Sequence, residues 1–411
     1  MTVFSPVKIG PLQQGHKLYS MMTINLVGEI MSVLGLIFLI QAYRQRARSL
    51  TLEHFVTFPD QELPGLSIVI AAKDEEKTLG PALDTLLSLD YPELEIILVE
   101  DRSQDRTLKV ATQRKQNHPQ GHRLQIIANK ELPSGWLGKV HALHQGCQAS
   151  TKPLILLTDA DVHFQPGSLK RAVSARQTLD CDHFVAAPRI EAEGFWEPLL
   201  VSFFLIMFAI RFQPSIVHRR KKSFVGVGAF NLLTREALEA CGYLEPLRLQ
   251  VTDDVDLGRL IKSQGRRQYC VVAQEGISVK WFEGLKGCIL GLEKNSYAGL
   301  EYNLPFALTV VASLLVPPLV PIVLTALGHA AWAGAYLLFL FLVGCTIPDS
   351  CHLPRWVGLF FPVASLVLAY TFGRSVFLAE KNHGINWRDT HYDLGELRAA
   401  HKHFVEDVAP L

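Results

Sequence analysis

The chain has 411 residues, of which 19% are charged, and its formal net charge is +1. This balance provides no global field that would attract nucleic acid, so we expect no nucleic-acid partner. The seven cysteines are scattered without a CxxC pair, which argues against a disulfide framework and against a zinc site. The length suffices for one sizeable α/β domain with accessory helices.

An apolar run with a single charged residue occupies residues 24–40. Its length approaches the roughly 20 residues needed to cross a bilayer. Arginines follow it at once, and basic residues beside a span tend to stay in the cytoplasm. We therefore expect a transmembrane helix at about 22–40, within an N-terminal segment 1–50, and a cytoplasmic domain after it. A cleaved signal peptide is the alternative, but its positive charge would precede the apolar run.

Short apolar strands alternate with helical segments between residues 60 and 300. The predicted strands are 66–70, 94–99, 124–128 and 154–158, and the predicted helices are 78–89, 107–116 and 139–148. This alternation predicts βαβ units and a mostly parallel sheet in an α/β domain.

A shorter apolar stretch lies inside this domain at residues 195–217. Arg211 interrupts it, and four basic residues follow at 219–222. The pattern predicts an interfacial helix whose basic end is attracted to anionic headgroups. A buried core helix is the alternative.

The C-terminal region 301–380 is expected to hold two to three membrane spans, and a tail follows at 381–411. The candidate runs are 305–327, 330–347 and 357–378. Core helices of a soluble domain are disfavoured because these runs offer no polar face to water. Three prolines in the first run predict a kinked or re-entrant segment. Four spans in all would place the C-terminus outside, and a re-entrant segment would place it inside.

Four acidic clusters lie at or near ends of the apolar elements. They are Asp74-Glu75-Glu76, Glu100-Asp101, Asp159-Ala160-Asp161 and Asp253-Asp254. Ligands of parallel α/β sheets bind at the carboxyl ends of the strands. Carboxylates crowded there repel one another unless a cation lies between them. Mg²⁺ or Mn²⁺ escorting a phosphorylated ligand is the simplest such cation.

Each cluster also has a simpler explanation. Asp159 and Asp161 suit a divalent ion and a ribose hydroxyl, or are solvated loop acids. Asp101 suits the imide N–H of a pyrimidine base, whereas nearby Asp105 is better explained as a helix cap. Lys139, after two glycines, suits a phosphate group or is a surface lysine. The pair at 253–254 suits a general base or a helix N-terminus.

The ordered set AAKDEE, LVEDRSQDRT, GWLGK, TDAD and TDDVDLG resembles the family 2 glycosyltransferases, which have a Rossmann-like GT-A fold. The match covers about residues 66–300. The flanking spans resemble the membrane-bound branch that glycosylates lipids, such as ceramide, hopanoid-associated and carotenoid glycosyltransferases. Segments 132–139 and 387–392 are most similar to the latter two groups.

The resemblance implies how the donor, a nucleotide sugar that we expect to be UDP-linked, would bind. Asp101 would bind the base, in a pocket lined by Ala72 and Glu75. Lys139 would approach the diphosphate, and Asp159 would contact the nucleotide.

The resemblance also implies the chemistry. Asp161 would ligate the metal, and Asp254 would be the catalytic base with Asp253 beside it. The family inverts the anomeric centre by direct displacement, which a single base without a separate nucleophile can support. Trp281 would line the acceptor site, or would anchor the chain at the membrane interface.

The chain departs from the family in one motif. Processive synthases carry Gln-x-x-Arg-Trp after the base cluster, and here the arginine is missing from residues 277–285. The cation that steadies the leaving diphosphate is therefore open, with Lys280, Lys286 and Arg388 as candidates.

We therefore predict an integral, multi-pass membrane enzyme with a cytoplasmic catalytic domain. It would transfer a hexose to a hydroxyl of a lipid such as a sphingolipid, carotenoid, hopanoid or glycerolipid. The rivals are a processive polysaccharide synthase, a non-catalytic nucleotide-binding scaffold and, more weakly, a transporter, which the scarcity of intramembrane charges disfavours.

Overall fold

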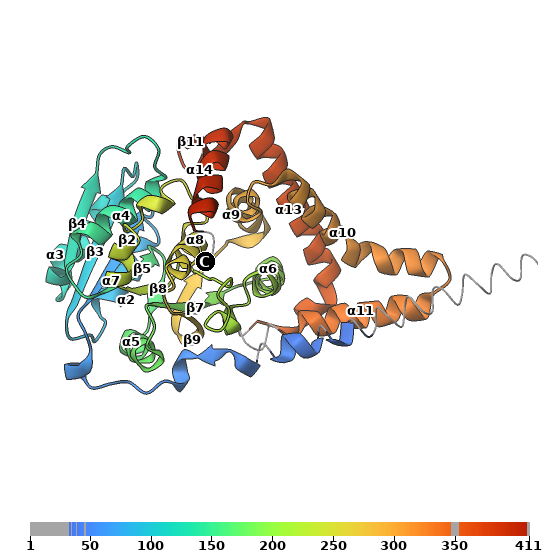
Figure 1. The fold of residues 1–411 in the computed structure, drawn as a ribbon, viewed down its shortest axis with the longest axis horizontal. Coiled ribbons are helices and arrows are strands. Elements are labelled where there is room, and N and C mark those ends of the chain that lie inside the picture. The colour runs from blue at the N-terminus through green and yellow to red at the C-terminus, as the bar shows by residue number, and fades with distance from the viewer. Residues whose placement is uncertain (1–32, 34, 38, 45–46, 347–352, 409–411) are drawn as a thin grey trace, which may run out of the picture.

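The computed structural model describes residues 33, 35–37, 39–44, 47–346 and 353–408 (Figure 1). Most of the span predicted at 22–40 lies outside these described residues. In the part that is described, Leu39 packs against the core and Gly35 lies against the ring of Phe339 on helix α11.

A nine-stranded mixed sheet forms the centre of the molecule, in the order β1-β9-β7-β8-β5-β2-β3-β4, with β6 paired to β9. Its strands are β1 (Leu50–Thr51), β2 (Leu66–Ala72), β3 (Leu94–Asp101), β4 (Leu124–Asn129), β5 (Leu154–Asp159), β6 (His163–Phe164), β7 (His183–Glu191), β8 (Asn231–Thr234) and β9 (Gln268–Lys280). The pairs among β5, β2, β3 and β4 are parallel, whereas β8 runs antiparallel to both of its neighbours. The prediction of a mostly parallel sheet is therefore confirmed.

Helices pack on both faces of this sheet. They are α2 (Leu79–Leu87), α3 (Thr107–Asn117), α4 (Gly138–Ala149), α5 (Ser168–Leu179), α7 (Arg235–Ala240) and α8 (Asp253–Ser263). Successive strand side chains point to opposite faces. In β2, Ile68 and Ile70 accordingly join the core under α2, while Val69 joins the core under α4 with Val140. Both faces of β2 are buried, which explains its unbroken apolar sequence.

The parallel strands end in register at one edge of the sheet. Ala71 is paired with Asp159, and Ala72 is paired with Glu100. The strands extend one to two residues beyond the predicted ends, so Asp101 and Asp159 are the last residues of β3 and β5. Carboxylates separated by about sixty residues in sequence are thereby brought to one place.

The apolar helices lie to one side of the sheet, with α6 and α9 between the sheet and the others (Figure 1). They are α6 (Trp196–Phe212), α9 (Gly284–Gly299), α10 (Leu304–Ala326), α11 (Ala330–Gly344) and α13 (Phe361–Lys381). Within the part of the chain that the structure describes, three helical stretches are long and apolar enough to cross a membrane, namely Trp196–Ile216, Leu304–Ala326 and Arg355–Lys381.

Three of these helices bear on the sequence expectations. The prolines of α10, predicted to make a kinked or re-entrant segment, lie inside one uninterrupted helix, so the re-entrant alternative is not observed. The predicted run 330–347 corresponds to α11, which has 15 residues and is shorter than the candidate spans. The stretch containing α6 was predicted to lie along the interface, yet its length and composition also suit a crossing.

The chain returns from α13 to the sheet. A two-stranded hairpin, β10 (Gly384–Trp387) and β11 (Thr390–Asp393), is followed by α14 (Leu394–Asp407). The side chain of Asp393 caps α14 by accepting a hydrogen bond from the amide of Glu396, at 2.9 Å. The segment predicted as a tail thus folds back towards the sheet domain (Figure 1).

Candidate active site

A cavity of about 1210 Å³ lies between the strand ends and the apolar helices. Each residue that the sequence assigned to the nucleotide, metal, base or acceptor site lines it. They are Ala72, Glu75, Asp101, Lys139, Asp159, Asp161, Asp253, Asp254 and Trp281. The fold therefore brings together the four acidic clusters and the lysine, as the in-register strand ends require.

Lys139 lies at the centre of the acidic side. As the second residue of α4, it places its ammonium 2.8 Å from a carboxylate oxygen of Asp159 and 3.5 Å from one of Asp253. Burial opposes its charge, but Asp159, Asp253 and Asp254 outweigh burial and raise the pKa of Lys139 above its usual range. This cation is therefore held in the charged form between Asp159 at the end of β5 and Asp253 at the start of α8.

Asp161 has no such partner among the ion pairs of the described residues. Burial, together with the charges of Asp159 and Glu75, raises the pKa of Asp161 to about 7. A buried carboxylate that is close to other acids and has no cationic partner among the described residues is suited to bind a divalent cation. Within the described residues, no group of three or more His, Cys, Asp and Glu side chains could hold a metal alone. A metal at Asp161 would thus need further oxygen ligands from a phosphorylated ligand.

Asp253 and Asp254 open helix α8 and also face the cavity. The carboxylate of Asp254 accepts hydrogen bonds from the amides of Gly228 and Val255, both at 2.8 Å. Burial and the charge of Asp253 raise the pKa of Asp254 to about 6. The pair therefore combines both explanations considered from the sequence: a helix start and a poised carboxylate.

Two glycines allow the loop before β8 to pack against these acids. A Cβ atom at Gly228 would come within 2.6 Å of a carboxylate oxygen of Asp159. A Cβ atom at Gly226 would clash with the main-chain oxygen of Asp254. Any larger residue at either position would push the loop away from the cavity.

The pocket that the sequence predicts for the nucleotide base contains an ion pair. Asp101 accepts two hydrogen bonds from the guanidinium group of Arg102, both at 2.9 Å. Asp105 accepts from the amide of Thr107, the first residue of α3, at 2.8 Å, in keeping with its predicted capping role.

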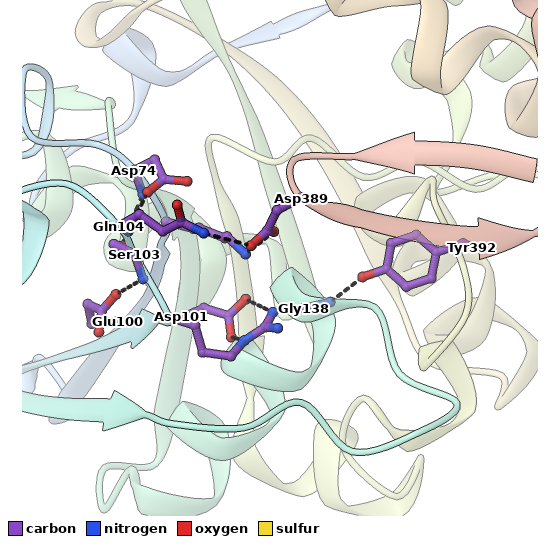
Figure 2. Close-up of polar contacts among 10 residues, drawn as sticks. Asp74, Glu100, Asp101, Ser103, Gln104, Gly138, Asp389 and Tyr392 are labelled. Carbon is purple, nitrogen blue, oxygen red and sulfur yellow. Dashed lines mark hydrogen bonds and ion pairs between the residues drawn. The ribbon is translucent and has the colours of Figure 1, made fainter.

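The β10–β11 hairpin lies beside the part of the cavity that contains Asp101 and Gly138 (Figure 2). Asp389 in its turn pairs with Lys73 at 2.5 Å and accepts from Gln104 at 3.4 Å. The hydroxyl of Tyr392 accepts from the amide of Gly138 at 3.3 Å, as Figure 2 shows. The hairpin thus contacts the loops that follow β2 and β3 and the start of α4.

Arg388, beside Asp389, pairs with Glu75 at 2.7 Å and lines the cavity. Of the three cations considered from the sequence, Lys280 instead pairs with Glu193 at 3.5 Å. Neither Lys280 nor Lys286 belongs to the cavity lining.

The opposite side of the cavity is apolar. Trp281 packs edge-on against Phe204 of α6, with ring centroids 4.8 Å apart, and stacks on Phe282. Further along, the lining comes from α6, α10 and α13. It includes Phe208, Phe212, Phe306, Val310 and Phe372. One cavity therefore connects the carboxylates to the helices with membrane-spanning character.

Sequence reasoning missed Lys294 of α9, which lines the cavity near Asp253 and Asp159. Its ammonium lies 4.0 Å from the centroid of the Trp387 ring. The available signal was a charged pair, Glu293 and Lys294, within an otherwise largely apolar helix.

Comparisons with known proteins agree with this geometry. The β-monoglucosyldiacylglycerol synthase of Synechocystis sp. is 28% identical over 318 residues, which cover 66% of this chain and 63% of that protein. Ceramide glucosyltransferase 1 of Caenorhabditis elegans is 24% identical over 52% of this chain and 45% of its own length. The chain thus spans less than two thirds of each of these relatives.

A mannosyltransferase from Pyrobaculum calidifontis, solved with GDP-Man and Mn²⁺, has a similar fold. Its TM-score is 0.51 at 18% identity, covering 88% of this chain and 98% of that one. Residues 64–280, more than half of the chain, match the family model described as glycosyltransferase like family 2. The resemblance and the GT-A-like fold are therefore confirmed, and the chain belongs to the family 2-like glycosyltransferases.

Proposed function

We propose that this glycosyltransferase moves a hexose from a nucleotide sugar to a hydroxyl group of a membrane lipid. The observation that carries the proposal is the continuity of one cavity from the acidic cluster to the apolar walls of α6, α10 and α13. A lipid whose chains remain among these helices could present its hydroxyl to the carboxylates. The names of the two curated relatives, which act on diacylglycerol and ceramide, support the same acceptor class.

The donor binds at the strand ends. Asp101, Ala72 and Glu75 form the base pocket, and Asp159 contacts the nucleotide. Lys139 meets the diphosphate as a charge fixed at the start of α4, where helix dipole and ammonium both favour an anion. We expect UDP as the nucleotide carrier.

Asp161 is the protein ligand of a divalent metal, Mg²⁺ or Mn²⁺. Its raised pKa and its lack of an ion-pair partner in the described part of the chain support this role. When bound, the metal supplies positive charge that favours departure of the diphosphate.

Asp254 is the general base. The acceptor oxygen attacks the anomeric carbon, the bond from that carbon to the phosphate oxygen breaks, and the hydroxyl proton passes to Asp254. Its two amide hydrogen bonds hold the carboxylate in one orientation. Asp253 stays beside it and pairs with Lys139. Because no second nucleophile is used, the anomeric centre is inverted.

Trp281 lines the acceptor side of the cavity. Its packing on Phe204 supports this role, because it ties the wall of the cavity to α6. We infer a multi-pass membrane protein with the catalytic domain on the cytoplasmic side, where nucleotide sugars are made. The three apolar helical stretches support the membrane part of this inference.

The proposal is tested by giving membranes that contain the protein a panel of nucleotide sugars and analysing the extracted lipids by mass spectrometry. A lipid whose mass increases by one hexose, present only with the active protein, is the expected result. Long polymer would instead support a processive polysaccharide synthase. Absence of any transfer with every donor would support a non-catalytic nucleotide-binding protein.

A further inference from the structure

Most lysine and arginine side chains that line the cavity already pair with a carboxylate. They are Lys73 with Asp389, Arg102 with Asp101, Lys139 with Asp159 and Asp253, Arg211 with Glu301, and Arg388 with Glu75. Among the described residues, the lining lysines and arginines without a carboxylate partner are Arg259 and Lys294. Arg259 lies 5.4 Å from the ring centroid of Phe224, and its charge acts on Asp256. Lys294 is thus the lining cation of the described residues that faces Asp159 and Asp253 without an ion pair.

The surroundings of Lys294 keep it unpaired. Its neighbour in sequence, Glu293, forms an ion pair with Arg374 of α13 and is not available to it. The aromatic partner of Lys294 is Trp387, whose ring centroid lies 4.0 Å from the ammonium. Such a cation–π contact fixes the position of the charge without neutralising it.

The charges that act on Lys294 belong to residues that line the cavity. Burial and the positive charge of Lys139 lower its pKa to about 8, while Asp253 and Asp159 act in the opposite direction. Lys294 therefore faces the same carboxylates as Lys139, but from the side of α9. An anion entering between the two lysines would relieve the repulsion between them.

A diphosphate is such an anion. Lys139, which is proposed to meet the diphosphate from α4, shares its charge with Asp159 and Asp253. Lys294 forms no ion pair with a carboxylate of the described residues, so it offers a second positive charge from the side of α9.

We propose that Lys294 contacts the donor diphosphate and that Trp387 is the positioning residue that holds its ammonium there. The inference rests on the proposed transfer from a nucleotide sugar. As the bond between the anomeric carbon and the phosphate oxygen breaks, its electron pair stays on that oxygen, and Lys294 stabilises the growing negative charge. The proton of the acceptor goes to Asp254, so Lys294 remains charged throughout.

The test compares UDP with UMP, which lacks the second phosphate, by calorimetric titration of the full-length protein with Mn²⁺ present. In Lys294→Met, UDP affinity should fall about ten- to a hundredfold, the usual cost of a charged hydrogen bond. UMP affinity should fall much less. Lys294→Arg should restore part of the preference for UDP.

Lys286→Met is the matched control, because Lys286 lies on the same helix outside the cavity. It should leave both affinities unchanged. Trp387→Leu should reduce the ratio of UDP affinity to UMP affinity. Trp387→Phe should reduce this ratio less, because a phenyl ring keeps some of the cation–π contact.

Three results would overturn the inference. Equal losses of UDP and UMP affinity in Lys294→Met would assign the lysine a structural role. Unchanged UDP affinity, in a protein whose wild type transfers sugar, would refute the inference and leave the proposed function intact. A wild type that binds neither UDP nor GDP would refute the proposed function together with the inference.

Discussion

Most carboxylates of the cavity come from the sheet domain, whereas two of its cations, Lys294 and Arg388, come from elements that follow this domain in the chain. We call the part of the cavity wall with the carboxylates the acidic side and the part with these two cations the basic side. Asp101 and Asp159 end strands of the sheet, and Asp254 begins a helix packed beside it. Lys294 and Arg388, by contrast, come from α9 and from the hairpin after α13. The sheet domain thus supplies the carboxylates that are proposed to bind a metal and to accept a proton. The elements associated with the apolar helices supply the two cations that are proposed to face the phosphorylated donor.

This division shows which contacts join the proposed donor site to the apolar helices. The hairpin is joined to the proposed donor site through Asp389 and Tyr392, and it packs against α13. A shift of α13 would therefore be transmitted to the Asp101 side of the cavity through the hairpin. Substitutions on the acidic side should lower the rate of sugar transfer, and substitutions on the basic side should mainly lower the affinity for the donor.

The largest effect is expected from Asp254→Asn. Loss of a general base slows transfer by about 10²–10⁴-fold. The side chain keeps its size, so nucleotide affinity should change little. Initial rates of lipid glycoside formation and calorimetry with UDP measure the two quantities on one preparation. Retained turnover would remove Asp254 from its proposed role.

The next effect is expected from Asp161→Asn, which removes one charge from the proposed metal ligand. Transfer should slow by about 10²–10³-fold, as when one electrostatic stabiliser of a transition state is lost. The dependence of UDP binding on Mn²⁺ should weaken as well, as a metal titration would reveal. Unaltered metal dependence would assign the metal to other residues.

The pH dependence should separate the neighbouring acids. Because the base must be ionised and the pKa of Asp254 is raised to about 6, the rate should fall as the pH drops through about 6. Asp253→Asn removes one of the charges that raise this pKa, so the acidic limb of the rate profile should move to lower pH. Asp407→Asn, at an exposed position of α14, is the control and should not move it. If the acidic limb of the rate profile stayed at the same pH in Asp253→Asn, the electrostatic coupling of the two carboxylates would be contradicted.

The smallest effect is expected from Asp389→Asn in the hairpin. Its ion pair with Lys73 is partly exposed, with 45% of the Asp389 side chain accessible, and such pairs contribute about 0.2–1 kcal/mol. UDP affinity should therefore fall by no more than about fivefold, with the maximal rate nearly unchanged. A large loss in maximal rate would show that the hairpin acts in the chemical step.

Much of the acidic side was predictable from the sequence, and little of the basic side was. Asp101 and Asp159 follow apolar strands, and the rule that parallel strands end at one edge places them together. Lys294 lies in a helix whose orientation depends on packing against α13, which no local pattern specifies. Arg388 was suggested by motif resemblance alone, because its ion pair with Glu75 joins residues more than three hundred positions apart.

The most direct test of the account is the anomeric linkage of the product formed from an α-linked donor such as UDP-α-glucose. If Asp254 activates the lipid hydroxyl for direct displacement, nuclear magnetic resonance of the extracted product should show a β-linked lipid glycoside. An α-linked lipid would require a second nucleophile and would contradict the proposed mechanism. Label found only in polymer would contradict the lipid acceptor.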